Sequence, residues 1–169
     1  LGVSKKLDSA VGMSLAVTFV MVMATAATWP LYMGILAPNG LEYLQTIVFI
    51  LVIAILVQLL ENFLKKFIPA LYKSLGVYLP LITTNCTILG VTILNLDNGY
   101  SFPESIVCAA GAGIGFLVAM VLFSGVRRKV EQAIVPECFK GLPITLVAAA
   151  MTSLSFMGFC GSVEAIFGV

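Results

Sequence analysis

The chain has no histidine and few charged residues, and each scarcity narrows what it can do. Of its 169 residues only 10% are charged, whereas 60% are hydrophobic. Soluble domains carry about 25% charged residues, so the lipid bilayer is the expected solvent. Without histidine, the chain lacks the commonest metal ligand and the usual proton shuttle. The net charge of +1 gives no electrostatic reason to expect nucleic acid as a partner.

Cysteine is also scarce, and the spacing of the cysteines gives no disulfide framework. The four cysteines form no CxxC pair, and three of them lie in hydrophobic stretches. A secreted disulfide framework is therefore not expected. The cysteines are Cys86, Cys108, Cys138 and Cys160. The glycine-rich run "GAGIG" (residues 111–115) follows no predicted strand, so it predicts close helix packing and no flavin or nicotinamide site.

Long apolar runs dominate the chain, and five of them approach the ~20 residues that a membrane helix needs. The candidate spans run from about Ala10 to Met33, Leu44 to Leu64, Ser74 to Leu94, Glu104 to Val126, and Gly141 to Val163. Backbone polar groups in lipid must be satisfied within the segment, so each span is expected to be helical. The sequence thus predicts one all-α integral membrane domain over residues 1–169.

The basic residues all fall on one side of this arrangement. They precede the first span or follow the second and the fourth, and the other loops and the tail hold only acids. These residues are Lys5, Lys6, Lys65, Lys66, Lys73, Arg127, Arg128, Lys129 and Lys140. Basic loops of membrane proteins face the cytoplasm, so we expect a multi-pass protein of the cytoplasmic (inner) membrane with its C-terminus outside.

An internal repeat is indicated by the tripeptide LGV, which occurs at Leu1 and at Leu89 and is followed each time by an acid–serine pair and an apolar run. Residues 1–73 then form a first repeat and residues 74–169 a second, with opposite orientations. Inverted repeats place working sites at broken helices near the membrane midplane. Since Cys86 precedes the second LGV, we expect a further span and a cysteine before the first. LGV as a common apolar tripeptide is the alternative.

The third span carries an unusual polar centre, "PLITTNCTILGV" (residues 80–91). Polar groups at this depth are costly unless they function, and Pro80 removes a backbone donor, so a broken helix is expected. The N–H groups around Asn85 and Cys86 would then face an anionic group. Cys86 is predicted to bind a metal, with Thr84, Asn85 and Thr87 donating hydrogen bonds to sulfur. A cysteine that only packs is the alternative, and is the expectation for the other three.

Other functions remain open on the residues alone. The Thr-Thr-Asn stretch is also compatible with the substrate or ion site of an inverted-repeat transporter or channel, or the chain could be a membrane scaffold. Gln58, Glu61 and Asn62 lie on one face near the end of the second span. They are either a solvated cluster beside Lys65 or a group that takes part in cation movement.

Five segments together resemble a known family of membrane proteins: "LGVSKKLD", "LEYLQTIVFILVIAILVQLLE", "LPLITTNCTILGV", "ESIVCAAGAGIGF" and "FKGLPITL". The family includes the A-type member of the Rnf complex, a membrane ferredoxin–NAD oxidoreductase of bacteria and some archaea. It also includes the E-type member of the sodium-pumping NADH–quinone oxidoreductase. The resemblance covers nearly the whole chain, and "PLITTNCTILGV" and "LEYLQTIVFIL" favour the Rnf member over the E-type alternative.

The resemblance implies six spans in an inverted repeat, with the cysteine-bearing spans broken into half-helices. It implies a homologous E-type sister of opposite topology, among the other Rnf subunits, and a 2Fe–2S iron–sulfur centre to which each of the two contributes two cysteines. Only Cys86 matches that motif here, and the second ligand is expected before Leu1. The implied function is electron transfer across the membrane in a complex that translocates Na⁺ or H⁺. No residue of this chain is expected to be catalytic.

Overall fold

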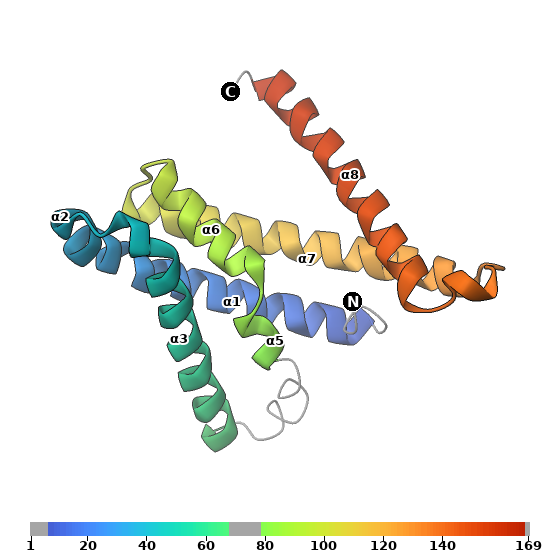
Figure 1. Cartoon of the computed structure of the whole chain (residues 1–169), viewed down its shortest axis with the longest axis horizontal. Helices are drawn as coiled ribbons and strands as arrows, with labels where there is room; N and C mark the ends of the chain where they lie inside the picture. Colours follow the sequence, from blue (N-terminus) through green and yellow to red (C-terminus); the bar gives the residue numbers. More distant parts are fainter. Residues whose placement is uncertain (1–6, 68–78, 168–169) are drawn as a thin grey trace. The chain divides into compact units, whose positions relative to one another are not determined.

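The protein, described by a computed structural model over residues 7–67 and 79–167, consists of helices joined by short connections (Figure 1). The chain divides into two compact units, which we describe separately. One is Val11–Val118, and the other comprises the described parts of Leu1–Ala10 and Ala119–Val169.

The elements follow one another along the described residues without a strand. They are α1 (Leu7–Leu31), a π-helical turn (Tyr32–Leu36), α2 (Ala37–Asn39), a 3-10 turn (Glu42–Leu44), α3 (Gln45–Phe67), α5 (Leu79–Thr83), α6 (Cys86–Asp97), α7 (Phe102–Gln132), a second 3-10 turn (Glu137–Phe139) and α8 (Leu142–Phe167). This confirms the predicted all-α membrane class.

Four helical stretches among the described residues are long and apolar enough to cross a membrane. They are Ala10–Asn39, Glu42–Phe67, Phe102–Gln132 and Leu142–Val163. Each corresponds to a predicted span. The remaining predicted span, from Ser74 to Leu94, starts outside the described residues and continues as α5 and α6. Because α6 has 12 residues and is about 18 Å long, it covers only part of the ~30 Å hydrocarbon core.

The first span extends beyond its predicted end at Met33 through the π-helical turn. There the Ala37 N–H donates to the Tyr32 carbonyl, five residues back. Pro38 has no N–H to donate to the Gly34 carbonyl, so the regular ladder stops here and the turn widens. The stretch ends at Gly40, whose φ of 65° is the left-handed conformation that glycine adopts readily.

Helix α1 lies at the centre of the unit Val11–Val118, because 44% of its most apolar window is buried. Its buried side chains include Val17, Met21 and Ala24. The Thr25 and Thr28 hydroxyls are buried too, and each donates to a carbonyl one turn earlier, at 2.9 and 2.8 Å. These bonds remove the cost of placing hydroxyl groups in an apolar core.

The start of α7 packs against α1 within the same unit. A Cβ atom added at Gly113 would collide with the Thr18 side chain, so the two backbones approach closely there. Near the opposite end of α1, the Trp29 Nε1–H donates to the Tyr100 carbonyl at 3.0 Å. The Trp29 ring also meets the Phe102 ring edge-to-face at 5.4 Å. The predicted close packing at "GAGIG" is therefore present at Gly113.

Helix α3 contacts both α5 and α6. Its buried side chains recur every four residues, at Phe49, Ile53 and Val57, so one face of the helix is turned into the unit. Near the start of that face, the Phe49 ring meets the Tyr32 ring of the π-helical turn at 6.4 Å. The other side of α3 carries exposed isoleucine and leucine side chains, as expected for a helix that contacts lipid or another protein chain.

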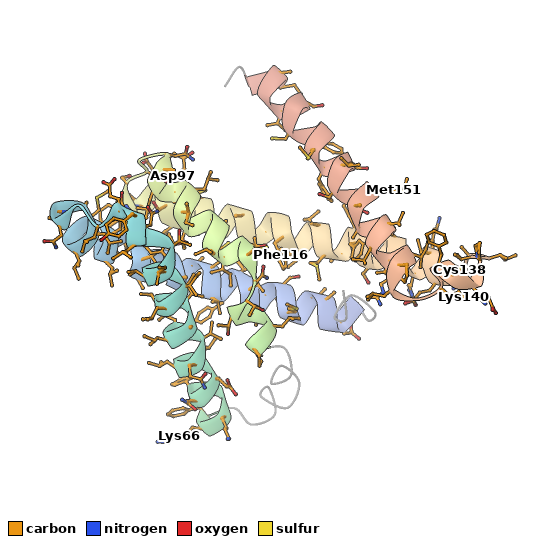
Figure 2. All side chains as sticks on the ribbon, in the orientation of Figure 1. Lys66, Asp97, Phe116, Cys138, Lys140 and Met151 are labelled. Atoms are coloured by element: carbon orange, nitrogen blue, oxygen red, sulfur yellow. The ribbon has the colours of Figure 1, made fainter. Side chains whose placement is uncertain are left out.

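In the C-terminal unit, α7 continues past the predicted end of its span at Val126 to Gln132. Arginine and lysine are good helix formers, so the charges that end the apolar run do not end the helix. A short connection that contains Cys138 and Lys140 then leads to α8 (Figure 2). The repeat boundary after residue 73 and the sidedness of the basic loops stay predictions, and Lys73 lies outside the described residues.

Candidate functional site

The predicted broken helix is present, and the chain turns between α5 and α6 (Figure 1). Helix α5 ends at Thr83 and α6 begins at Cys86, so Thr84 and Asn85 form the interruption. Asn85 is extended, with φ −76° and ψ 111°. Its Oδ1 accepts a hydrogen bond from the Thr87 N–H at 3.0 Å, and its carbonyl accepts one from the Ile88 N–H at 3.2 Å. Asn85 is therefore the N-cap of α6.

Cys86 occupies the first position of α6, and its side chain is exposed. The N–H groups of a first helical turn have no carbonyl partner inside the helix, and the helix dipole adds partial positive charge there. A bound anionic group is favoured at such a position. The local fold thus places the predicted ligand where a negatively charged group is stabilised.

The polar neighbours of Cys86 have partners within their own segment. The Thr84 hydroxyl donates to the Leu81 carbonyl at 3.3 Å. The amide oxygen of Asn85 accepts from the backbone of Thr87, which is half-buried. The predicted hydrogen bonds from Thr84, Asn85 and Thr87 to a bound sulfur stay a prediction.

Pro80 was expected to help break the helix, and the interruption is found four residues further on. Pro80 itself lies inside α5. Residue 76, whose carbonyl the proline ring would crowd in a continuous helix, lies outside the described residues. The local bonds that define the interruption are those of Asn85.

The remaining cysteines do not complete a metal site with Cys86. Cys108 is half-buried within α7, whereas Cys138 and Cys160 are exposed in the C-terminal unit. Over the described ranges, no group of three or more His, Cys, Asp or Glu side chains is placed to hold a metal ion.

The predicted polar cluster on α3 is split between two environments. Glu61 is half-buried and continues the four-residue spacing of Phe49, Ile53 and Val57, so it lies on the inward face of α3. Gln58 and Asn62 are exposed on the neighbouring face.

A polar pair that the sequence analysis did not predict lies where α6 approaches the start of α7. Asn95 is 1% exposed, and its Nδ2 donates to the Ser105 carbonyl at 3.2 Å. The Asn95 Oδ1 and the Ser105 Oγ are both buried without a hydrogen-bond partner among the described residues. An asparagine inside the apolar run "TILNLD" (residues 92–97) was the available signal.

The sequence family described as "Rnf-Nqr subunit, membrane protein" matches residues 1–163. A relative from Syntrophotalea carbinolica, named as the A component of an ion-translocating oxidoreductase complex, is 53% identical over 163 residues, which cover 96% of this chain and 84% of that protein. A relative from Acetobacterium woodii is named as the A component of a Na⁺-translocating ferredoxin:NAD⁺ oxidoreductase complex. It is 53% identical over 161 residues, which cover 95% of this chain and 84% of that protein. The relative from Aliivibrio salmonicida, with the same name as the first, is 49% identical over 164 residues (97% and 85%).

Proposed function

The chain belongs to the Rnf–Nqr family of membrane subunits, and from this membership we propose that it is the A-type component of an ion-translocating oxidoreductase complex. In this proposal it carries electrons across the membrane through an iron–sulfur centre that it shares with a homologous E-type partner of opposite topology. The three relatives described above are all named as A components, which favours the A-type assignment over the E-type alternative.

The observation that carries the proposal is the exposed thiol of Cys86 at the start of α6. Iron–sulfur clusters are held by thiolates, usually four, and their negative charge suits a helix N-terminus. Cys86 fits such a group as one ligand. In the proposed shared centre, the remaining ligands would come from other cysteines, including those of the partner.

Each part of the interruption has a defined role in this proposal. Cys86 would hold one iron, and the Asn85 cap fixes the orientation of the first turn of α6, which carries the thiol. The bound cluster would supply one-electron redox chemistry. A carrier near the middle of the ~30 Å hydrocarbon core divides the distance that electrons must cross. Flavin and nicotinamide reactions would then belong to other subunits of the complex.

The proposal includes a cellular arrangement. The protein would reside in the cytoplasmic membrane of a bacterium or archaeon, with its basic loops in the cytoplasm and its C-terminus outside. The translocated ion would be Na⁺ or H⁺, and the relative from Acetobacterium woodii is named for Na⁺.

The test is a Cys86→Ala variant in the purified complex, compared with Cys108→Ala and Cys160→Ala as matched controls. We expect Cys86→Ala to lose about two iron atoms per complex, together with the visible absorption of a 2Fe–2S centre and transmembrane electron transfer. The two controls should retain all three properties, since their side chains lie within α7 and α8. Unchanged iron content and electron transfer in Cys86→Ala would show that the proposal is wrong.

A further inference from the structure

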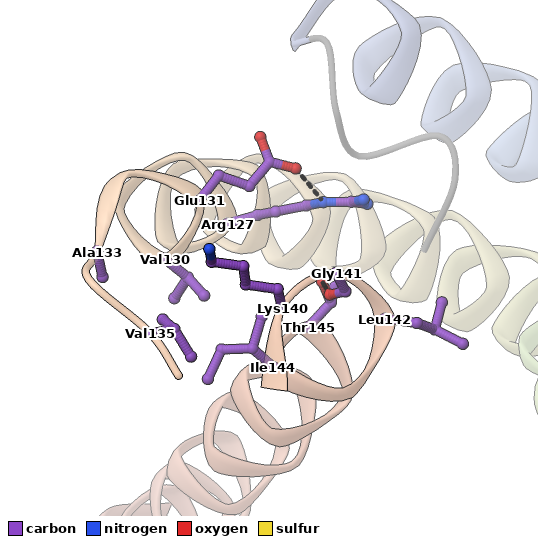
Figure 3. A pocket seen from close by; sticks show the side chains of 10 residues that line it. All are labelled: Arg127, Val130, Glu131, Ala133, Val135, Lys140, Gly141, Leu142, Ile144 and Thr145. Carbon is purple, nitrogen blue, oxygen red and sulfur yellow. Dashed lines mark hydrogen bonds and ion pairs between the residues drawn. The ribbon is translucent and has the colours of Figure 1, made fainter. Parts of the chain in front are cut away.

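A cavity of about 370 Å³ lies in the C-terminal unit, where the last turns of α7 and the first turns of α8 face one another (Figure 3). Its volume is within the ~300–1,000 Å³ range of sites for small molecules and cofactors. From α7 it is lined by Arg127, Val130 and Glu131, and from the α8 side by residues that include Lys140 and Ile144. The lining therefore combines charged and apolar side chains from both sides.

The charged side chains that line the cavity are two basic residues and one acidic residue, Arg127, Lys140 and Glu131. Arg127 is only 8% exposed, and its Nε lies 3.3 Å from the Glu131 carboxylate. Lys140 extends toward the same side of the cavity (Figure 3), and its Nζ is 3.8 Å from the carboxylate of Glu137, which does not line the cavity. Two cations and one carboxylate thus line the site. This charge balance favours an anionic occupant.

An apolar groove of about 440 Å³ begins at the same place, because Val130 lines both the cavity and the groove. The groove runs between α7, where Leu122 and Val126 line it, and α8, where Met151 and Phe159 do. From Ala148 to Phe159 it follows α8 for roughly 16 Å. This is about half of the ~30 Å hydrocarbon thickness, which is the depth of one bilayer leaflet.

The cavity and the groove therefore match the two parts of one amphiphilic molecule. We propose that this face binds an anionic glycerophospholipid, with its phosphate in the cavity beside Arg127 and Lys140 and one acyl chain in the groove. The site lies where the apolar run of α7 gives way to basic residues, which is the level of the lipid headgroups. Basic pockets between membrane helices at this level bind phospholipid headgroups in other proteins.

The alternative occupants fit only part of the face. Inorganic phosphate would satisfy the charges of the cavity and leave the groove empty. An apolar helix of another protein chain would fill the groove and leave the cavity empty. Only an occupant with a charged end and an apolar tail uses both surfaces.

The experiment is native mass spectrometry of the detergent-purified complex, titrated with phosphatidylglycerol, phosphatidylcholine or inorganic phosphate. Each Lys or Arg near a membrane surface contributes about fivefold to the affinity for anionic lipid. The double variant Arg127→Gln, Lys140→Gln is therefore expected to weaken phosphatidylglycerol binding roughly 30-fold. Arg128→Gln removes a charge from the same basic run outside the cavity, so it is the matched control.

Two further arms test the groove and the integrity of the fold. Ala148→Leu places a larger side chain in the groove without changing charge, and should lower binding of phosphatidylglycerol in an otherwise intact complex. Lys140→Gln alone changes an exposed side chain, so it reports on charge even if the buried Arg127 position does not tolerate substitution. The proposal is overturned if these variants bind phosphatidylglycerol as Arg128→Gln does, if phosphatidylcholine binds equally well, or if inorganic phosphate binds as tightly as phosphatidylglycerol. Loss of a neighbouring protein chain from the variants would overturn it too, by showing that this face is a protein interface.

Discussion

Gly113 marks a close approach of α7 to α1, and Gly113→Ala tests that contact directly. A Cβ atom built at Gly113 would lie 2.7 Å from the Thr18 Oγ1 and 2.8 Å from the Thr18 Cβ. Because Thr18 is held by a 2.8 Å hydrogen bond to the Ser14 carbonyl, its side chain has little freedom to turn away. Overpacking of this kind costs about 1–3 kcal/mol, so the variant should lower the stability of the complex.

Two control variants separate the cost of the Gly113–Thr18 collision from the gain in helix propensity that any Gly→Ala change brings. Gly111→Ala and Gly115→Ala are matched controls on the same helix, because a Cβ at either position meets nothing within 4 Å in this chain. Both should be neutral or gain up to about 1 kcal/mol from the better helix former. The assay is the temperature at which half of the purified complex is lost from its size-exclusion peak, for which a destabilisation of about 1–3 kcal/mol predicts a shift of several degrees.

A second-site change tests whether Thr18 is the cause. Thr18→Gly removes the three atoms nearest to the new methyl group, so it should restore most of the stability lost in Gly113→Ala. Thr18→Ala keeps the Cβ atom at 2.8 Å and should restore only part of it. The coupling in this double-mutant cycle should be about 0.5–3 kcal/mol. If Gly113→Ala is as harmless as Gly111→Ala, or if Thr18→Gly gives no rescue, the close approach of α1 and α7 is wrong.

Two further predictions concern polar groups. Asn85→Ala should destabilise the complex by about 1 kcal/mol, because the Thr87 N–H loses its cap, whereas Asn85→Ser keeps an acceptor and should cost less. The melting midpoint of the complex checks both variants. Equal decreases in that midpoint for Asn85→Ala and Asn85→Ser would contradict the N-cap role of Asn85. Ser105→Ala should leave the melting midpoint unchanged or raise it, because it removes a buried hydroxyl without a partner among the described residues. Asn95→Ala should lower that midpoint, since it also removes the hydrogen bond to the Ser105 carbonyl. A clearly lower midpoint in Ser105→Ala would contradict this prediction, because it would show that the Ser105 hydroxyl has a bound partner.

The membrane helices were predictable because hydropathy and backbone hydrogen bonding leave little choice in lipid. Their ends were less predictable. The prediction ended the fourth span at Val126, where the charges begin, whereas α7 continues to Gln132 because its basic residues sustain a helix. The prediction also missed the widened turn at Tyr32–Leu36, which depends on which backbone donors remain when Pro38 provides none.

The candidate site was predictable in kind and not in detail. Pro80 in an apolar run with a polar centre indicated a broken helix, and the structure has the interruption at Thr84–Asn85, four residues after that proline. The N-cap geometry of Asn85 depends on a particular backbone conformation, which a residue pattern does not specify. The cavity beside Arg127 was not predictable from the sequence either, because it forms only where the end of α7 and the start of α8 face one another.

The interruption between α5 and α6 has a consequence for how the cell handles this protein. In a membrane, backbone outside a helix is tolerated only where protein covers it or water reaches it. A copy that has not yet assembled therefore exposes the non-helical backbone at Thr84–Asn85 to lipid, and this makes the free chain less stable than the assembled one. Its abundance should consequently follow that of its partners, with surplus copies removed by membrane proteases.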